Sequence, residues 1–170
     1  MTRGRSRWWL VVGLLSCVAL VGGAAAAGDS ADDVPEVTRE ILGQTSPAQA
    51  PGYELYLVRV IVPAGAELAP HTHPGTQVAH IEQGTLTYSI ISGTATVVRA
   101  GTDGEPGESE EVTGPVTVKL RRGDTVIETV GLVHEAANRG KKKIIIVLTA
   151  LLTEGAPLSE PVDGMPAASG

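Results

Sequence analysis

The sequence of 170 residues contains no phenylalanine, and aromatic residues make up only 3% of it. Its hydrophobic core must therefore be built from Val, Ile, Leu and Ala. Cys17 is the only cysteine, and the chain has four histidines. Outside the N-terminal segment, no stretch shows the apolar period of 3.6 residues that predicts an amphipathic helix. These absences exclude a disulfide framework and argue against a helical fold.

The residues that are abundant are typical of short strands joined by turns. Branched aliphatic residues favour strands, and 21 glycines and 11 prolines interrupt them. Hydrophobic residues account for 42% of the chain, which is not the composition of a disordered protein. A chain of this length has room for one domain around one core.

The first residues are expected to form a secretory signal peptide. Arg3, Arg5 and Arg7 precede the apolar run WWLVVGLLSCVALVGG and the small residues AAAAG. A positive start, an apolar middle and a small-residue cleavage site together indicate a signal peptide. Cleavage after Ala27 defines residues 1–27 as the signal and predicts a secreted or periplasmic protein.

Two other fates of this segment stay open. Residues 8–27 could remain as a membrane anchor, because about 20 apolar residues span a bilayer. The sequence LLSC, which ends at Cys17, resembles a bacterial lipoprotein cleavage site, although the apolar run continues past the cysteine. Cleavage after Ala27 would leave a mature chain without cysteine, and hence without a disulfide, a thiolate nucleophile or a Cys-ligated metal.

The charge balance is acidic. The formal net charge is -6, and the expected signal peptide carries three arginines and no acidic residue, so its removal lowers the charge to -9. An acidic protein is repelled by phosphate backbones and by anionic lipid surfaces. We therefore expect no nucleic-acid partner and, after signal cleavage, no membrane partner.

The rest of the chain alternates between β-forming stretches and turn signals. We expect residues 28–52 to be a linker and N-terminal arm, in which 37–44 could form a short strand. A β-barrel is expected over residues 53–153, and a C-terminal tail over 154–170. The clearest expected strands are 53–62, 76–82, 85–91, 94–98, 116–120, 125–129 and 143–152. Closely spaced short strands of this kind predict an all-β sandwich or barrel.

Three of the four histidines lie within ten residues, HTHPGTQVAH, 71–80. Alternate residues of a strand face the same side, so His71 and His73 lie side by side and suit one metal ion. We expect Gln77, on a strand that runs back past the first, to supply a further ligand through its side-chain oxygen. His80 is out of phase with Gln77 and is expected to face away.

His134 lies about sixty residues further on, after a turn signal at Gly131. A compact barrel can bring its strand back beside the first. Three neutral imidazoles and one amide oxygen suit a divalent ion such as Fe, Mn, Co, Ni, Cu or Zn. The sequence therefore predicts one transition-metal site formed by His71, His73, Gln77 and His134, with positions left for water or substrate.

Two stretches resemble the paired motifs of the cupin superfamily. GAELAPHTHPGTQVAHIEQG, 65–84, is similar to the first motif, which has a Gly, five residues, His-X-His, three or four residues, Glu, six residues and Gly. GDTVIETVGLVHEAAN, 123–138, is similar to the second, which has a Gly, then Pro-X-Gly, two residues, His, three residues and Asn. Thr129 stands where that Pro usually is. The matching residues are Gly65, His71, His73, Gln77, Gly84, Gly123, Gly131, His134 and Asn138.

The resemblance spans roughly residues 37–153 and implies a cupin-like double-stranded β-helix, a jelly-roll barrel with a metal in its mouth. It carries His71, His73 and His134 over as metal ligands, and it implies a homodimer. Gln77 departs from the family pattern, which usually has Glu there; a few cupins, including one acting on unsaturated uronates in pectin breakdown, are similar in having Gln. Gln cancels none of the metal's charge, which favours weaker metal binding, a stronger Lewis acid and an anionic ligand.

Three further features have plain structural interpretations. Tyr88 is expected in the core, with an acid or base role as the alternative. Glu135 follows His134 and faces away, so we expect a solvated or paired carboxylate. The acidic loop 101–111 lacks an ordered pattern of calcium ligands and is expected to be a solvated insertion.

Two classes of function are consistent with these residues. The first is a secreted metalloenzyme, of dioxygenase or isomerase/lyase type, acting on a small oxygenated substrate. The second is a non-catalytic module that binds a metal or a small ligand. The fold does not decide between them. The sequence shows no clear second catalytic group, and such a group in the pocket would favour the enzyme.

Overall fold

The computed structural model describes residues 35–162 and residue 164, all within one compact unit. The expected signal peptide and Cys17 lie outside these residues. All regular secondary structure in the described part of the chain is β-strand. Their bounds are β1 Thr38–Thr45, β2 Tyr53–Val62, β3 Glu67–Thr72, β4 Gly75–Gln83, β5 Thr85–Ser92, β6 Thr94–Val98, β7 Ser109–Thr113, β8 Val116–Arg121, β9 Thr125–Glu128, β10 Val133–Ala137, β11 Ile144–Thr153 and β12 Glu160–Pro161. Over the same residues, the chain contains no helix long and apolar enough to cross a bilayer.

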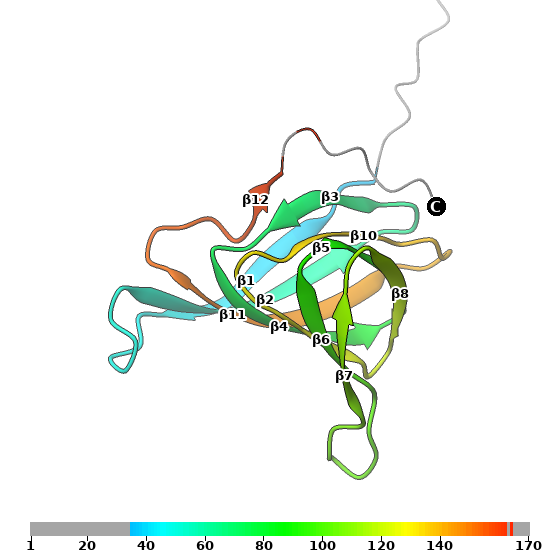
Figure 1. Ribbon diagram of the computed structural model, residues 1–170, viewed down its shortest axis with the longest axis horizontal. Helices are drawn as coiled ribbons and strands as arrows, with labels where there is room; N and C mark the ends of the chain where they lie inside the picture. The colour runs from blue at the N-terminus through cyan, green and yellow to red at the C-terminus, as the bar shows by residue number, and fades with distance from the viewer. Residues whose placement is uncertain (1–34, 163, 165–170) are drawn as a thin grey trace, which may run out of the picture. The chain divides into compact units, whose positions relative to one another are not determined.

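The strands form two sheets that face each other (Figure 1). The seven-stranded sheet has the order β1-β2-β11-β4-β9-β6-β7, and the five-stranded sheet has the order β12-β3-β10-β5-β8. Neighbouring strands pair antiparallel throughout both sheets. The predicted all-β jelly-roll barrel is confirmed.

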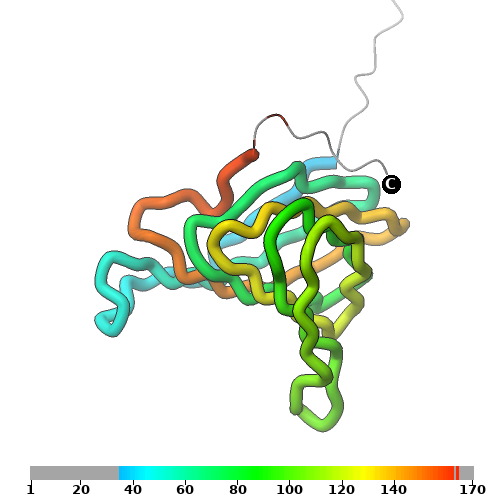
Figure 2. The backbone as a smooth tube through the Cα atoms, in the orientation of Figure 1, coloured from blue at the N-terminus to red at the C-terminus, as the bar shows by residue number. Residues whose placement is uncertain are grey.

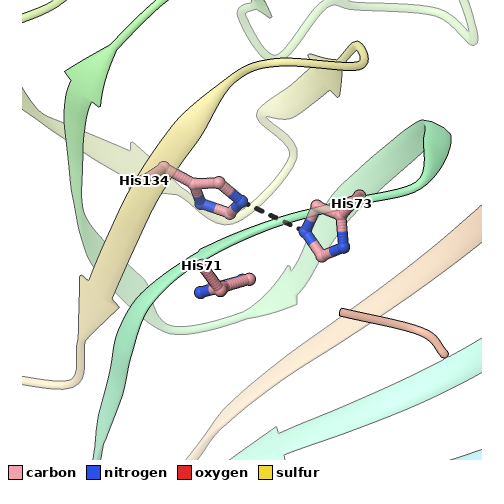
Figure 3. A group of neighbouring side chains, drawn as sticks. All are labelled: His71, His73 and His134. Carbon is pink, nitrogen blue, oxygen red and sulfur yellow. Dashed lines mark hydrogen bonds between the residues drawn. The ribbon is translucent and has the colours of Figure 1, made fainter. Parts of the chain in front are cut away.

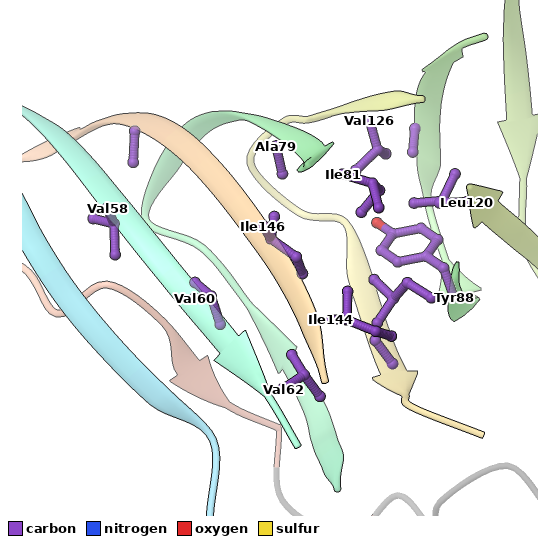
Figure 4. Packing of buried hydrophobic residues seen from close by; sticks show 14 of the residues in the cluster. Val58, Val60, Val62, Ala79, Ile81, Tyr88, Leu120, Val126, Ile144 and Ile146 are labelled. Atoms are coloured by element: carbon purple, nitrogen blue, oxygen red, sulfur yellow. The ribbon is translucent and has the colours of Figure 1, made fainter. Parts of the chain in front are cut away.

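The core lies between the sheets and consists almost wholly of aliphatic side chains (Figure 4). Val58, Val60 and Val62 on β2 point inward and are no more than 4% exposed. Tyr88 and Leu120 reach the same core from the five-stranded sheet. Each fully buried side chain of this size contributes roughly 1.5–3 kcal/mol through the hydrophobic effect. The core is therefore the aliphatic one that the missing phenylalanine predicts.

The path from β3 to β4 differs from the expectation. The sequence interpretation placed β4 beside β3, but β3 pairs with β10 and β12, whereas β4 pairs with β11 and β9 in the opposite sheet. Gly75 makes this crossing feasible, because a Cβ at this position would collide with the backbone of Leu151 on β11. The side chains of β4 therefore reach the barrel interior from the side opposite to β3.

Two segments are more regular than the sequence suggests. The expected N-terminal arm contains β1, which pairs with β2 along its length. The acidic loop, expected over 101–111, is shorter because Ser109 to Glu111 belong to β7, which pairs with β6. Figure 2 shows the connection between β6 and β7 extending away from the sheets. Its residues 101–106 are exposed, as expected for a solvated insertion.

Candidate metal centre

Three buried histidines, of which His134 lies far from the other two in the sequence, are neighbours in the structure (Figure 3). His71 lies on β3 and is the direct cross-strand partner of His134 on β10. His73 follows the end of β3. The three side chains are buried, and one ring nitrogen from each lies within 4.8 Å of the others. The expected return of the His134 strand beside the first is confirmed.

Backbone carbonyls set the orientation of two of the rings. The Nδ1 atoms of His71 and His73 lie 2.7 Å from the carbonyl oxygens of Ala69 and Leu158. A carbonyl oxygen only accepts, so each Nδ1 carries the proton and each Nε2 presents a lone pair. The Nε2 atoms of His73 and His134 lie 3.1 Å apart. Two nitrogens bound to one ion at ~2.1 Å, roughly 90–110° apart, lie about 3.0–3.4 Å from each other, so this spacing fits a metal.

Burial keeps the three imidazoles neutral, which is the form that binds a metal. Loss of solvation lowers the pKa of His73 to about 4. The same cause, with the nearby His71, lowers the pKa of His134 to about 3. The pKa of His71 is also lowered, again through burial. His134 Nδ1 is buried without a hydrogen-bond partner among the described residues. The donor set therefore fits a divalent transition metal better than it fits a proton.

Gln77 approaches the histidines from the opposite sheet. It is 3% exposed, and its cross-strand partner on β9 is Glu128. The amide Nε2 of Gln77 donates a hydrogen bond of 3.2 Å to Glu128 Oε2. The structure thus places the expected amide in the pocket and turns its NH₂ group toward a carboxylate.

Glu128 was not predicted as a site residue. It is 4% exposed, and its Oε1 accepts a 2.8 Å hydrogen bond from the hydroxyl of Tyr88. Its carboxylate oxygens lie 3.4 Å from His73 Nε2 and 3.6 Å from His134 Nδ1. Burial raises the pKa of Glu128, although His73, Tyr88 and other neighbours oppose the increase. The alternation of the strand could have predicted it. Glu128 lies two residues after Val126, on the same inward face of β9, where a carboxylate is unusual.

The other three candidate residues have different outcomes. His80 is exposed and its Nδ1 lies 3.0 Å from Thr125 Oγ1, so it faces away as predicted. Tyr88 is 1% exposed and is a core residue as expected, and its ring centre lies 5.0 Å from that of His134. Glu135 is only 8% exposed, so of the two expected alternatives, a solvated or a paired carboxylate, the solvated one is wrong.

A cavity of about 70 Å³ adjoins the three histidines. One water needs ~10–15 Å³, so this space suits a small ligand of a few heavy atoms. Gln77, Glu128 and Tyr88 line it beside the histidines, and most of the remaining wall is aliphatic. Of the described residues that line the cavity, Arg39 on β1 is the one with a fixed positive charge.

No protein-family model matches the chain, and no curated protein sequence matches it. Among solved structures, the DMSP lyase DddQ from Ruegeria pomeroyi DSS-3 is similar with a TM-score of 0.52 and 17% identity, over 79% of this chain and 57% of that one. A cupin superfamily protein from Desulfitobacterium hafniense DCB-2 gives a TM-score of 0.46 at 13% identity, over 69% and 78% of the two chains. KdgF from Halomonas sp. gives 0.45 at 21% identity, over 70% and 83%. At these identities the likeness concerns the fold alone, and the fold is the cupin-like double-stranded β-helix.

Proposed function

We propose that this protein binds one divalent transition metal through His71, His73 and His134 and uses it to act on a small oxygenated ligand in the adjoining cavity. The observation that carries the proposal is the convergence of three buried, neutral imidazoles in the wall of that cavity. A metal there would supply Lewis-acid or redox chemistry, as in a dioxygenase or an isomerase/lyase. The protein's own residues would hold the ligand, exclude water and fix its orientation.

The cavity favours an enzyme over a module that only stores metal. Beside the histidines it contains a buried carboxylate, Glu128, and a buried phenol, Tyr88, joined by a hydrogen bond. Metal storage requires neither group, whereas catalysis commonly uses ionisable groups held in a water-poor pocket. A non-catalytic binding module remains the alternative function.

Arg39 supports an anionic ligand. Its cross-strand partner is Val60, whose side chain faces the barrel interior, so Arg39 lies on the same face of the sheet, although Arg39 itself is exposed. No ion pair to Arg39 occurs within residues 35–162, and the residue lines the cavity. A guanidinium at this place could pair with a carboxylate or enolate group of the ligand. The proposal includes a secreted or periplasmic location, and the homodimer implied by the resemblance stays a prediction.

The test is metal content by elemental analysis of the full chain, purified without an affinity tag or a chelator. Wild-type protein should contain close to one Fe, Mn, Co, Ni, Cu or Zn ion per chain. The His71→Ala variant should lose it, because the site then has only two imidazoles. His80→Ala is the matched control, because it removes the exposed histidine and leaves the cluster intact.

Wild-type protein that takes up no metal, even after reconstitution, would overturn the proposal. Equal metal content in His71→Ala and His80→Ala would also overturn it, because the metal would then be held elsewhere. A stoichiometric redox metal would justify oxygen-uptake assays with phenolic and enol substrates. No turnover of such substrates, combined with tight ligand binding, would leave the binding module.

A further inference from the structure

The barrel carries an acidic side chain beside the histidines, but on a strand other than the one that was expected to provide the oxygen ligand. Gln77 on β4 and Glu128 on β9 are direct cross-strand partners. Both side chains are buried and face the cavity. The carboxylate that Gln77 lacks is therefore present one strand to the side.

The two oxygens of Glu128 have different surroundings. Oε1 accepts the hydrogen bond from Tyr88 and lies on the side of His134 Nδ1. Oε2 accepts the hydrogen bond from Gln77 and lies 3.4 Å from His73 Nε2, the atom whose lone pair faces the cluster. Ligand atoms that share one ion lie about 3.0–3.4 Å apart, so Oε2 is at the distance expected of a ligand adjacent to His73. Glu128 is not part of the group of mutually close donor atoms that the three histidines form, so its side chain must move toward the ion to bind it.

The charge of Glu128 is also unbalanced without a metal. No lysine or arginine within residues 35–162 lies within salt-bridge distance of its carboxylate. Burying an unpaired carboxylate is costly, and the neighbouring histidines are neutral. A divalent cation beside Oε2 would balance this charge and would also bind the Nε2 atoms of His73 and His134, which lie 3.1 Å apart.

We propose that Glu128 is the oxygen ligand of the metal, through Oε2, and that Gln77 is a positioning residue that holds this carboxylate by its NH₂ group. The inference rests on the proposed three-histidine metal site. The resulting site has three imidazoles and one carboxylate. Unlike a site with Gln77 as the oxygen ligand, it cancels one of the metal's two positive charges. Tyr88 holds the other oxygen and fixes the rotation of the carboxylate.

The experiment is a titration of the metal-stripped full chain with Co²⁺, which reports affinity and, through its visible d–d absorption, the ligand set. Glu128→Gln should weaken Co²⁺ binding by more than about 100-fold and change the absorption, because a loss of that size exceeds what a group that only orients a ligand contributes. Glu128→Asp keeps the charge but withdraws the oxygens, and should weaken binding by at least about 10-fold. Gln77→Ala should cost about 10-fold or less and leave the absorption unchanged.

Two results would overturn the inference. One is Co²⁺ binding by Glu128→Gln within about 10-fold of wild type with the same absorption, which would show that the carboxylate is not a ligand. The other is a loss in Gln77→Ala that equals or exceeds the loss in Glu128→Gln, with an altered absorption. Failure of wild-type protein to bind Co²⁺ more tightly than His71→Ala would instead overturn the metal site itself. Thermal unfolding of each variant checks that it is folded.

Discussion

Strand β9 carries a buried carboxylate at each end of the same face, and the two carboxylates have opposite surroundings. Asp124 directly precedes the strand and Glu128 ends it, with Val126 between them on the inward side. Each carboxylate residue is only 4% exposed. Because strand and face are shared, the difference between them comes from their neighbours and from their depth, since Glu128 is enclosed more deeply than Asp124.

Asp124 has a complete set of partners within the protein. It accepts hydrogen bonds from the backbone N–H groups of Ala100 at 3.0 Å and Arg121 at 2.9 Å, and from the guanidinium of Arg99 at 3.1 Å. Burial raises the pKa of Asp124, but these hydrogen bonds and the charge of Arg99 outweigh it and hold the pKa below its usual value. Its role is structural, since it ties the β8–β9 turn to the end of β6.

Glu128 has hydrogen bonds, but within residues 35–162 no Lys or Arg pairs with it. Its neighbours are an amide, a phenol and neutral imidazoles, and burial raises its pKa. The comparison teaches that burial of a carboxylate does not itself indicate function. A carboxylate whose charge is balanced inside the protein stabilises the fold, whereas one without a fixed cation is arranged for a partner that binds later.

The largest effect on stability should come from replacing Asp124. Asp124→Ala leaves two backbone donors without their acceptor and removes one acceptor of the Arg99 guanidinium, which keeps Glu110, so the free energy of unfolding should fall by about 3 kcal/mol. Urea denaturation measures this change. Asp124→Asn keeps an acceptor oxygen and should lose less. A loss below about 1 kcal/mol in Asp124→Ala would break the comparison, because Asp124 would then be no more structural than an exposed residue.

The stability of the metal-free protein should depend on pH in two separate ranges, one set by the histidines beside Glu128 and the other by Asp124. The unfolded chain binds protons at its histidines near pH 6.5, whereas His73 and His134 stay neutral in the fold until about 4 and about 3. Stability should therefore fall as the pH drops below about 6.5, because the unfolded state binds more protons. The lowered pKa of Asp124 adds its own loss only below about 3.8.

Thermal unfolding of chelator-treated protein between about pH 8 and pH 5 checks this order. His73→Gln should flatten the dependence, because it removes one buried imidazole, whereas His80→Ala keeps all three and should follow wild type. A dependence that is unchanged in His73→Gln would contradict the assignment to the metal-site histidines.

The smallest effect should come from Glu128 in the metal-free protein, and it should have the opposite sign. Glu128→Gln removes an unbalanced buried charge and keeps an acceptor for Tyr88, while the Gln77 amide turns its oxygen toward the new NH₂ group, so stability near neutral pH should rise by about 1 kcal/mol. A carboxylate with a raised pKa stabilises the fold below its unfolded value of about 4.5 and loses that contribution as the pH rises. The gain in Glu128→Gln should therefore vanish toward pH 4.5. If Glu128→Gln instead lost as much stability as Asp124→Ala, the two carboxylates would not differ in role.

Much of the fold could be predicted from the sequence, because it depends on local patterns. Alternation on β5 and the turn signals around Gly84 and Gly93 determine strands without reference to the rest of the chain. Asn138, which matches the second motif, has a local role that the structure explains: its side chain bonds to Gly140 and Lys142 and holds the turn after β10. Its further bond to Val62, 76 residues away, is not local. The spacing of His71 and His73 likewise requires only the two-residue period of a strand.

The features that the sequence did not predict depend on which strands become neighbours. The contact between Glu128 and Gln77 exists because β9 pairs with β4, and nothing within either strand specifies that pairing. The same holds for Arg99 and Asp124, which are 25 residues apart. The path of β4 into the opposite sheet depends on the close approach of Gly75 to β11, and this approach is visible only once β11 is in place.

The carbonyl of Leu158, which orients His73, lies after the last long strand of the barrel. This segment returns to the metal end, where Glu160 and Pro161 pair with Thr72 and His71 and Leu158 lines the cavity. The proposed metal site therefore depends on residues 158–161, which follow the last long strand of the barrel. A chain shortened after Thr153 would keep every proposed ligand and the long strands of both sheets. It would lose the Leu158 carbonyl, which orients the imidazole of His73. Anyone trimming this protein for crystallisation should place the cut beyond Pro161.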